Sequence, residues 1–347
     1  MPTLSNEQIL LVLVALAVIL AVGRGSAEVA RRVGQPEVLG ELIGGCLLGP
    51  SVLGALLPGV RHELFLHEPV GLSLSAFSWV GAVLLLFIAG LEVDLDILRA
   101  EAKPGAFATL FAMVPSLAVG TAFGLIVLDR SFAASTFLGV VLSVTAVSVA
   151  AKILMERDTL RRGYAQVILA AGVASEVLVW LLVSIVASFG NGSPLRAGLQ
   201  SFVFAVLFFV VMMTIGRRFT FWAMRRVADL SGLINGQLSL VLILVFLSAA
   251  LTHWLGLHAL LGAFVFGVLL SRSPRATISL KENVQALTVG VFGPIFFVLA
   301  GMRVDVSKLG QASQVGTMLL LFVVATTVKI GGSALGARLG GQGGWAP

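Results

Sequence analysis

The chain has 347 residues, of which 58% are hydrophobic and only 12% are charged, with a net charge of +6. Soluble domains contain about 25% charged residues, so this composition excludes a soluble enzyme and a disordered chain. The single cysteine, Cys46, excludes an intrachain disulfide. A mean hydropathy of +1.04 and repeated apolar runs long enough to cross a bilayer as helices indicate an all-α polytopic membrane protein.

Eleven apolar segments are predicted to span the membrane. In chain order they cover residues 5–33, 36–50, 73–97, 105–128, 132–156, 163–189, 197–227, 237–254, 257–271, 285–301 and 312–337. The first segment lacks the basic start and the clean cleavage site of a signal peptide. We therefore expect it to remain as a helix.

The distribution of Lys and Arg predicts the topology, because both residues are enriched in cytoplasmic loops. If the N-terminus lies outside, most of the 23 Lys and Arg residues fall at cytoplasmic ends, among them Lys152 and Arg157. A few, such as Arg61 and Arg130, fall outside. This asymmetry predicts a multi-pass protein of the cell membrane with an external N-terminus. It also explains the basic charge without a nucleic acid partner.

Two pairs of segments indicate an internal repeat. Residues 39–49, LGELIGGCLLG, are similar to residues 257–267, LHALLGAFVFG, and both 80–96 and 290–306 contain A-G-[LM]-x-V-D. Each pair relates a span to the seventh span after it, so the two copies run in opposite directions. Inverted repeats are typical of secondary transporters, whose sites lie near the midplane at the repeat interface.

The repeat divides the chain into three parts. Residues 1–190 form a first repeat of six transmembrane helices, residues 191–235 a linker helix, and residues 236–347 a second, incomplete repeat of four helices. Because the second copy lacks partners for two spans of the first, we expect a chain truncated at its C-terminus by about two helices.

Two ionisable residues are predicted to lie at membrane depth, whereas we place the other charged residues at helix ends or in loops. Glu176 falls near the middle of span 163–189, and Lys329 falls within span 312–337. Such groups cost about 2.5–3.5 kcal/mol to insert and usually mark an ion path. We interpret Glu176 as the ion- and proton-binding carboxylate and Lys329 as its buried basic partner. The alternatives are a structural salt bridge or a protonated packing role for Glu176, and an amine reaching the cytoplasmic end for Lys329.

Hydroxyl side chains near these charges are candidate ligands of a cation. Thr145 and Ser148 lie in span 132–156, and Ser175 precedes Glu176. An interruption of that span would add backbone carbonyls, as in broken transporter helices, although Ser and Thr in helices often bond their own backbone.

Acidic residues at the end of span 73–97 are a weaker candidate. Glu92 and Asp94 form either a cytoplasmic cation funnel or a solvated helix end. The sequence contains no motif for ATP use or hydrolysis and no His spacing typical of metal ligands. We therefore expect no catalytic residues, no metal site and no cofactor.

Several motifs carry a resemblance to a known family. They are Gly34-Gln35-Pro36-Glu37 with LGELIGGCLLGPSVLG, then FIAGLEVDLDIL, TAVSVAAKILMERDTL, ASEVLVW, LHALLGAFVFGVLLSR and GPIFFVLAGMRVDVSKL. The chain resembles the monovalent cation:proton antiporter superfamily, on the second branch, which includes sodium/proton antiporters and glutathione-gated potassium efflux systems.

The resemblance implies the sodium/proton-antiporter fold with inverted repeats, of which about 11 of the 13 transmembrane helices would be present. It also implies a homodimer, a core domain that moves against a dimerisation domain, and a buried basic residue at Lys329. Two departures from the family pattern stand out. Ser175 and Glu176 replace the paired Asp residues frequent on the sixth helix, which favours electroneutral exchange, and Ser148 replaces a frequent Pro on the broken helix.

These observations predict a secondary active transporter that exchanges Na⁺ or K⁺ for a proton by alternating access. One carboxylate that binds either a cation or a proton would couple the two fluxes. The alternatives are a non-transporting or regulatory membrane protein and a potassium efflux system that acts like a channel.

Overall fold

The computed structural model describes residues 4–91, 93, 102–145, 147–159, 162–165, 167–169, 171–172, 175, 178–179, 182, 194–231, 234–271, 278–309 and 312–341. Regular structure within these residues is helical throughout. Eight helices among them are long and apolar enough to cross a membrane. The prediction of an all-α, multi-pass class is therefore confirmed.

Ten of the predicted spans overlap helices of the structure, and span 163–189 lies largely outside the described residues. The helices are α1 (Asn6–Arg32), α2 (Glu37–Leu48), α3 (Leu53–Leu56), α4 (Pro58–Arg61), α5 (Glu68–Leu91), α7 (Ala102–Ile126), α8 (Phe132–Ser143), α9 (Val147–Glu156), α11 (Pro194–Val211), α12 (Arg217–Ser231), α13 (Ile234–Trp254), α14 (Ala259–Ser271), α15 (Ile278–Leu287), α16 (Gly293–Gly301) and α17 (Ala312–Leu339). Short π-helical turns at Met212–Gly216 and Thr288–Phe292 join α11 to α12 and α15 to α16. Span 132–156 is divided by a non-helical interruption into α8 and α9.

The start of α1 shows how local sequence sets a helix boundary. The Ser5 hydroxyl accepts from the backbone amide of Gln8 at 3.2 Å, and the Gln8 side chain accepts from the Ser5 amide at 2.9 Å. This reciprocal pair satisfies amides that have no partner within the helix. At the other end, Gly34 takes a φ of +73°, which a residue with a Cβ rarely adopts. The chain can therefore turn sharply from α1 into α2.

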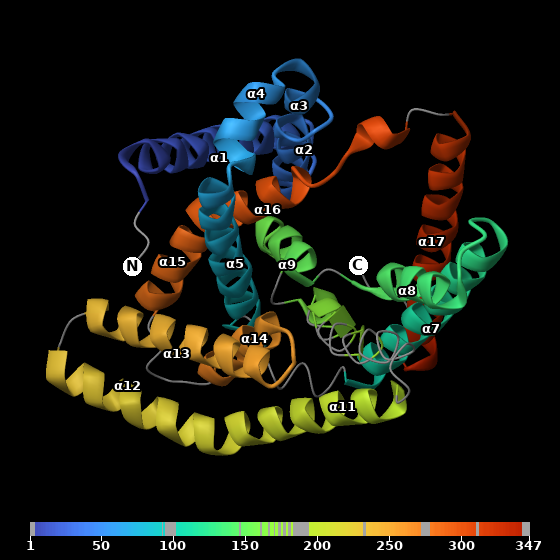
Figure 1. Ribbon diagram of the computed structural model, residues 1–347. Coiled ribbons are helices and arrows are strands. Elements are labelled where there is room, and N and C mark those ends of the chain that lie inside the picture. Colours follow the sequence, from blue (N-terminus) through green and yellow to red (C-terminus); the bar gives the residue numbers. More distant parts are fainter. Residues whose placement is uncertain are drawn as a thin grey trace.

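The helices form two groups (Figure 1). We call α1, α2, α5, α13, α14, α15 and α16 the scaffold bundle, because they pack around the two largest buried apolar clusters. We call α7, α8 and α17 the three-helix bundle. In Figure 1 the three-helix bundle lies to one side, α9 lies between the two groups, and α11 and α12 run along the lower edge of the view.

Small residues let the helices of the scaffold bundle cross closely. A Cβ added to Gly301 of α16 would lie 2.1 Å from the carbonyl oxygen of Leu42 in α2. A Cβ added to Gly267 of α14 would lie 2.2 Å from the carbonyl oxygen of Phe87 in α5. Because no side chain fits at either crossing, α2 packs against α16 and α5 packs against α14. Both crossings join an early helix to a late one.

Glycines also allow two helices of the three-helix bundle to cross closely. On α17, Gly332 and Gly336 face the backbone of α7, where an added Cβ would lie 2.1 Å from the carbonyl oxygen of Phe111 and 2.3 Å from that of Phe107. The two glycines are four residues apart and therefore lie on one face of the helix. This close crossing brings α17 alongside α7 and, through α7, near α8.

Candidate functional site

An interruption separates α8 from α9. The helix α8 ends at Ser143, Val144 is extended with φ −62° and ψ 139°, and α9 begins at Val147. The last carbonyl groups of a helix have no amide partner within it. In a membrane such groups must be satisfied by other parts of the protein or face a cavity. The end of α8 is therefore a cluster of carbonyl oxygens that requires a partner.

Lys329 of α17 is that partner. Its ammonium donates to the carbonyl oxygen of Val144 and lies 3.4 Å from the carbonyl oxygens of both Leu142 and Ser143. The side chain is partly buried. A cation at the C-terminal end of a helix is favoured because the backbone dipoles point their negative ends there. The amine therefore contacts the interruption. The alternative interpretation, in which it reaches the cytoplasmic end of its span, is not the arrangement in the structure.

The hydroxyl residues predicted as cation ligands occupy different positions. Thr145 lies in the interruption itself and is partly buried. Ser148 lies in the first turn of α9, and its side chain is outside the described part. Ser175 is buried, and its hydroxyl donates to the carbonyl oxygen of Gly172 at 2.7 Å. That bond is of the kind that Ser and Thr hydroxyls often make to their own helix backbone, the alternative raised for Thr145 and Ser148.

The other predicted site residues, Glu176, Glu92 and Asp94, lie outside the described residues. Val179 is a described residue of the same predicted span. Val179 packs in one buried cluster with Met113 of α7 and Val140 of α8. The side chain of Val179 therefore lies beside α8, the helix that ends at the interruption.

The structure contains a buried ion pair that we did not predict. The ammonium of Lys152 in α9 donates to Oε2 of Glu41 in α2, and the two side chains are 1% and 0% exposed. The same ammonium lies 5.0 Å from the ring centroid of Phe297 in α16, within the range of a cation–π contact. We expected charged residues other than Glu176 and Lys329 to lie at helix ends or in loops, and we did not expect two of them to be buried and paired with each other.

A signal for the pair was present in the sequence. Glu41 is a single carboxylate within the apolar run LGELIGGCLL, and Lys152 follows the apolar stretch VSVAA. Glu41 does not stand out because its span is short. Lys152 does not stand out because a Lys near the end of a span fits a cytoplasmic loop. The pairing itself joins residues 111 positions apart, which spacing along one helix does not reveal.

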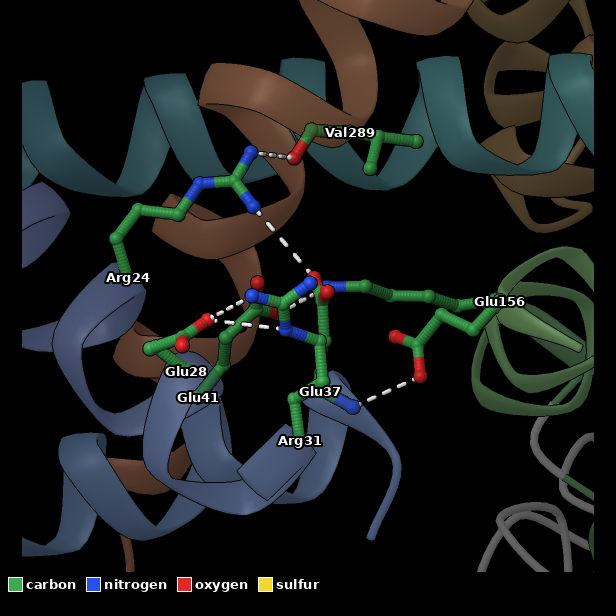
Figure 2. A network of polar contacts seen from close by, with 8 residues as sticks. Arg24, Glu28, Arg31, Glu37, Glu41, Glu156 and Val289 are labelled. Carbon is green, nitrogen blue, oxygen red and sulfur yellow. Dashed lines mark hydrogen bonds and ion pairs between the residues drawn. The ribbon is translucent and has the colours of Figure 1, made fainter. Parts of the chain in front are cut away.

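Polar contacts continue from this pair toward the start of α2 (Figure 2). Oε2 of Glu156, the last residue of α9, accepts from the backbone amide of Glu37 at 2.8 Å. Arg24 of α1 lies 3.6 Å from Oε2 of Glu37 and donates to the carbonyl oxygen of Val289 at 2.8 Å. Val289 lies in the π-helical turn before α16, so Arg24 braces α1 against that turn. These contacts connect α1, α2, α9 and the approach to α16.

Comparison with known proteins identifies the family. Residues 12–345 match the family described as sodium/hydrogen exchanger, transmembrane. The chain therefore belongs to the sodium/hydrogen exchanger family, within the monovalent cation:proton antiporter superfamily that the sequence motifs indicated.

Named relatives agree with this assignment. The chain is 30% identical over 330 residues to a probable Na⁺/H⁺ antiporter, GerT, of Bacillus cereus, covering 94% of this chain and 82% of that protein. It is 31% identical over 337 residues to a Na⁺/H⁺ antiporter of Enterococcus hirae, covering 93% and 80%. It is 29% identical over 331 residues to K⁺/H⁺ antiporter 1 of Saccharomyces cerevisiae, covering 88% of this chain and 37% of that longer protein.

A solved structure shares the fold. The sodium proton antiporter MjNhaP1 of Methanocaldococcus jannaschii superposes with a TM-score of 0.60, covering 97% of this chain and 80% of that chain at 14% identity. At this identity the likeness shows the arrangement of helices alone. It supports the antiporter fold that the motifs implied.

Proposed function

We propose that this protein exchanges Na⁺ or K⁺ for a proton by alternating access, with one charge moving in each direction. The observation that carries the proposal is the interruption between α8 and α9, where carbonyl oxygens meet the ammonium of Lys329. Interrupted helices with exposed carbonyl ends bind cations in secondary transporters. The names of the bacterial and yeast relatives support a monovalent cation and a proton as the two substrates.

In this proposal Glu176 is the shared carboxylate. A nearby cation favours its charged form, and a bound proton makes it neutral, so the two ligands exclude each other. Thr145, Ser148 and Ser175 would complete the oxygen ligands of the cation. Lys329 would hold the end of α8 in place and stabilise the empty, ionised site. Because one carboxylate carries either one cation or one proton, the exchange is electroneutral.

The proposed movement takes place between the two bundles. Residues 1–190 and 236–347 would form inverted repeats joined by a linker at 191–235. In the scaffold bundle, α2 packs against α16 and α5 packs against α14. An inverted repeat that relates α2 to α14 and α5 to α16 would exchange these two contacts, so the packing supports it. The three-helix bundle would then move against the scaffold bundle of a homodimer in the cell membrane, with the N-terminus outside.

The experiment uses the purified full chain in proteoliposomes that enclose a pH-sensitive dye. With an acidic interior imposed, external Na⁺ or K⁺ should drive proton efflux and restore the dye signal. Glu176→Gln should abolish the response, because a neutral amide cannot exchange a cation for a proton. Glu282→Gln, at an exposed position of α15, is the matched control and should respond as the unaltered protein does.

Either of two outcomes would refute the proposal. An unaltered protein that moves no protons in response to either cation would exclude exchange. A Glu176→Gln protein that matches the Glu282→Gln control would remove the role assigned to Glu176.

A further inference from the structure

The helix α9 connects the two bundles. It follows α8, which belongs to the three-helix bundle, and it packs against α2 and α5 of the scaffold bundle. Leu154 of α9 belongs to the buried apolar cluster centred on α5 and α14. If the three-helix bundle moves, the surface between α9 and α2 must therefore slide, bend or open.

That surface has a defined pattern of polar contacts. Lys152 of α9 pairs with Glu41 of α2, and Glu156 of α9 accepts from the amide of Glu37 in α2. Lys152 and Glu156 are one turn apart on α9, and Glu37 and Glu41 are one turn apart on α2. Glu156, the later residue of α9, contacts Glu37, the earlier residue of α2. The two helices therefore run antiparallel along two matched contacts. We call these four residues the α2–α9 zipper.

The chemistry of the zipper makes it selective for one relative position of the two helices. The Glu41 and Lys152 side chains are buried almost completely, and a buried ion pair that loses one partner leaves an uncompensated charge in a dry site. The amide of Glu37 lies at the N-terminus of α2, where the partial positive charge of the helix favours a carboxylate such as Glu156. Both contacts depend on close approach, and a displacement of one turn, about 5.4 Å, would break both.

The apolar contacts between the same helices are less selective. Apolar side chains can repack after a small displacement because their attraction has no fixed direction. The polar contacts therefore determine which position of α9 is held.

We propose that the α2–α9 zipper is a gate that locks one of the two access states and must open during each exchange cycle. Glu41 and Lys152 are then positioning residues that act on the movement of α9 and touch neither substrate. This inference rests on the proposed exchange function. On the proposed topology the zipper lies at the cytoplasmic ends of α2 and α9, so its closure shuts that side.

A reversible crosslink tests the gate. In a Cys46→Ser background, Glu37→Cys and Glu156→Cys place one thiol on each helix at the more accessible contact of the zipper and leave Glu41 and Lys152 intact. A short bifunctional thiol reagent that a reductant can cleave then joins α2 to α9. The matched control, Arg24→Cys with Glu37→Cys, keeps one thiol and moves the other to α1, which lies within the scaffold bundle.

The proteins are compared before and after cleavage of the linker, in the dye-loaded proteoliposomes. Linking α2 to α9 should lower the exchange rate by about tenfold or more, because turnover depends on the conformational step, and cleavage should restore it. Linking α1 to α2 should change the rate little. Equal rates for the linked and cleaved α2–α9 protein would overturn the gate, and would show that the zipper is a static brace.

A second measurement does not require transport. In detergent, the yield of the α2–α9 link should change when Na⁺ or K⁺ replaces a large organic cation at the same pH, because bound cation shifts the population of the two states. The control link should form equally in both salts. A constant α2–α9 yield would overturn the gate, whereas absence of exchange by the cleaved protein would refute the proposed function instead.

Discussion

The ammonium of Lys329, in α17, donates to the carbonyl oxygen of Val144, where α8 ends 185 residues earlier in the chain. This contact gives the interruption of a membrane helix a charged partner from a distant helix. It also fixes the position of α17 relative to α8, in addition to the close crossing of α17 with α7. The stability of the interruption and the proposed exchange should therefore both depend on Lys329.

Replacing Lys329 by Met should separate these effects from simple loss of volume. Met fills similar space but leaves the carbonyl oxygens of α8 without a donor, which costs about 1–3 kcal/mol for a buried polar group. We expect a lower apparent melting temperature in detergent and a strongly reduced exchange rate. Lys329→Arg keeps the charge and should retain more of both.

Lys281→Met, on α15 and outside the proposed site, is the control. A Lys329→Met protein that melts and exchanges like this control would show that the contact with Val144 carries neither stability nor function.

The crossing of α17 and α7 makes a sharp prediction about two adjacent glycines. An added Cβ at Gly332 would lie 2.1 Å from a backbone oxygen, whereas at Gly331 nothing lies within 4 Å. Gly332→Ala should therefore destabilise the protein by about 1–3 kcal/mol through overpacking, and Gly331→Ala should not. Thermal unfolding of the two variants in detergent measures the difference, and equal melting temperatures would mean that α17 does not cross α7 at this point.

The sequence predicted an all-helical membrane protein, because hydropathy alone locates apolar helices. It indicated an interruption near Thr145 and Ser148 only as one alternative, and it did not predict the partner of that interruption. The stretch Val144–Thr145 contains neither Gly nor Pro, and the carbonyl oxygen of Val144 accepts from a lysine 185 residues away. The residues near Val144 in the sequence do not identify such a distant partner.

The sequence singled out some charged residues of the candidate site and not others, depending on their depth within the apolar spans. Glu176 and Lys329 stand out because each lies deep within an apolar span. Glu41 and Lys152 lie nearer to span ends, where charged residues are common, so neither was recognised. Only the fold brings them together, and their burial follows from the packing of α9 against α2.

The buried pair of Glu41 and Lys152 should show strong coupling in a double-mutant cycle. Removing one charge leaves the other buried and unpaired, and costs about 3–5 kcal/mol. Glu41→Leu combined with Lys152→Met removes both charges and should be closer to the unaltered protein than either single variant.

Thermal unfolding of the four proteins gives the coupling free energy. Glu28→Gln, which breaks an exposed contact with Arg31 and Arg32, should change little because exposed ion pairs contribute little. If the changes in unfolding free energy of the two single variants add up to that of the double variant, the two side chains do not interact, which would contradict the ion pair.

Two exposed arginines test the topology around the interrupted helix. Arg130 precedes α8 and Arg157 follows α9. With Cys46 replaced by Ser, Arg130→Cys should react with a membrane-impermeant thiol reagent added outside intact cells. Arg157→Cys should react only after the membrane is opened. Labelling of both from the same side would exclude a crossing of the membrane between these two positions.

The most direct measurement of the central claim is proton release on cation binding. The unbuffered protein in detergent, held near the pH at which exchange is half-maximal, is titrated with Na⁺ or K⁺ while a soluble indicator reports pH. Mutual exclusion at Glu176 predicts that each bound cation displaces about one proton, and that Glu176→Gln releases none while Glu282→Gln releases as much as the unaltered protein. Cation binding without proton release, or equal release by Glu176→Gln, would contradict the account.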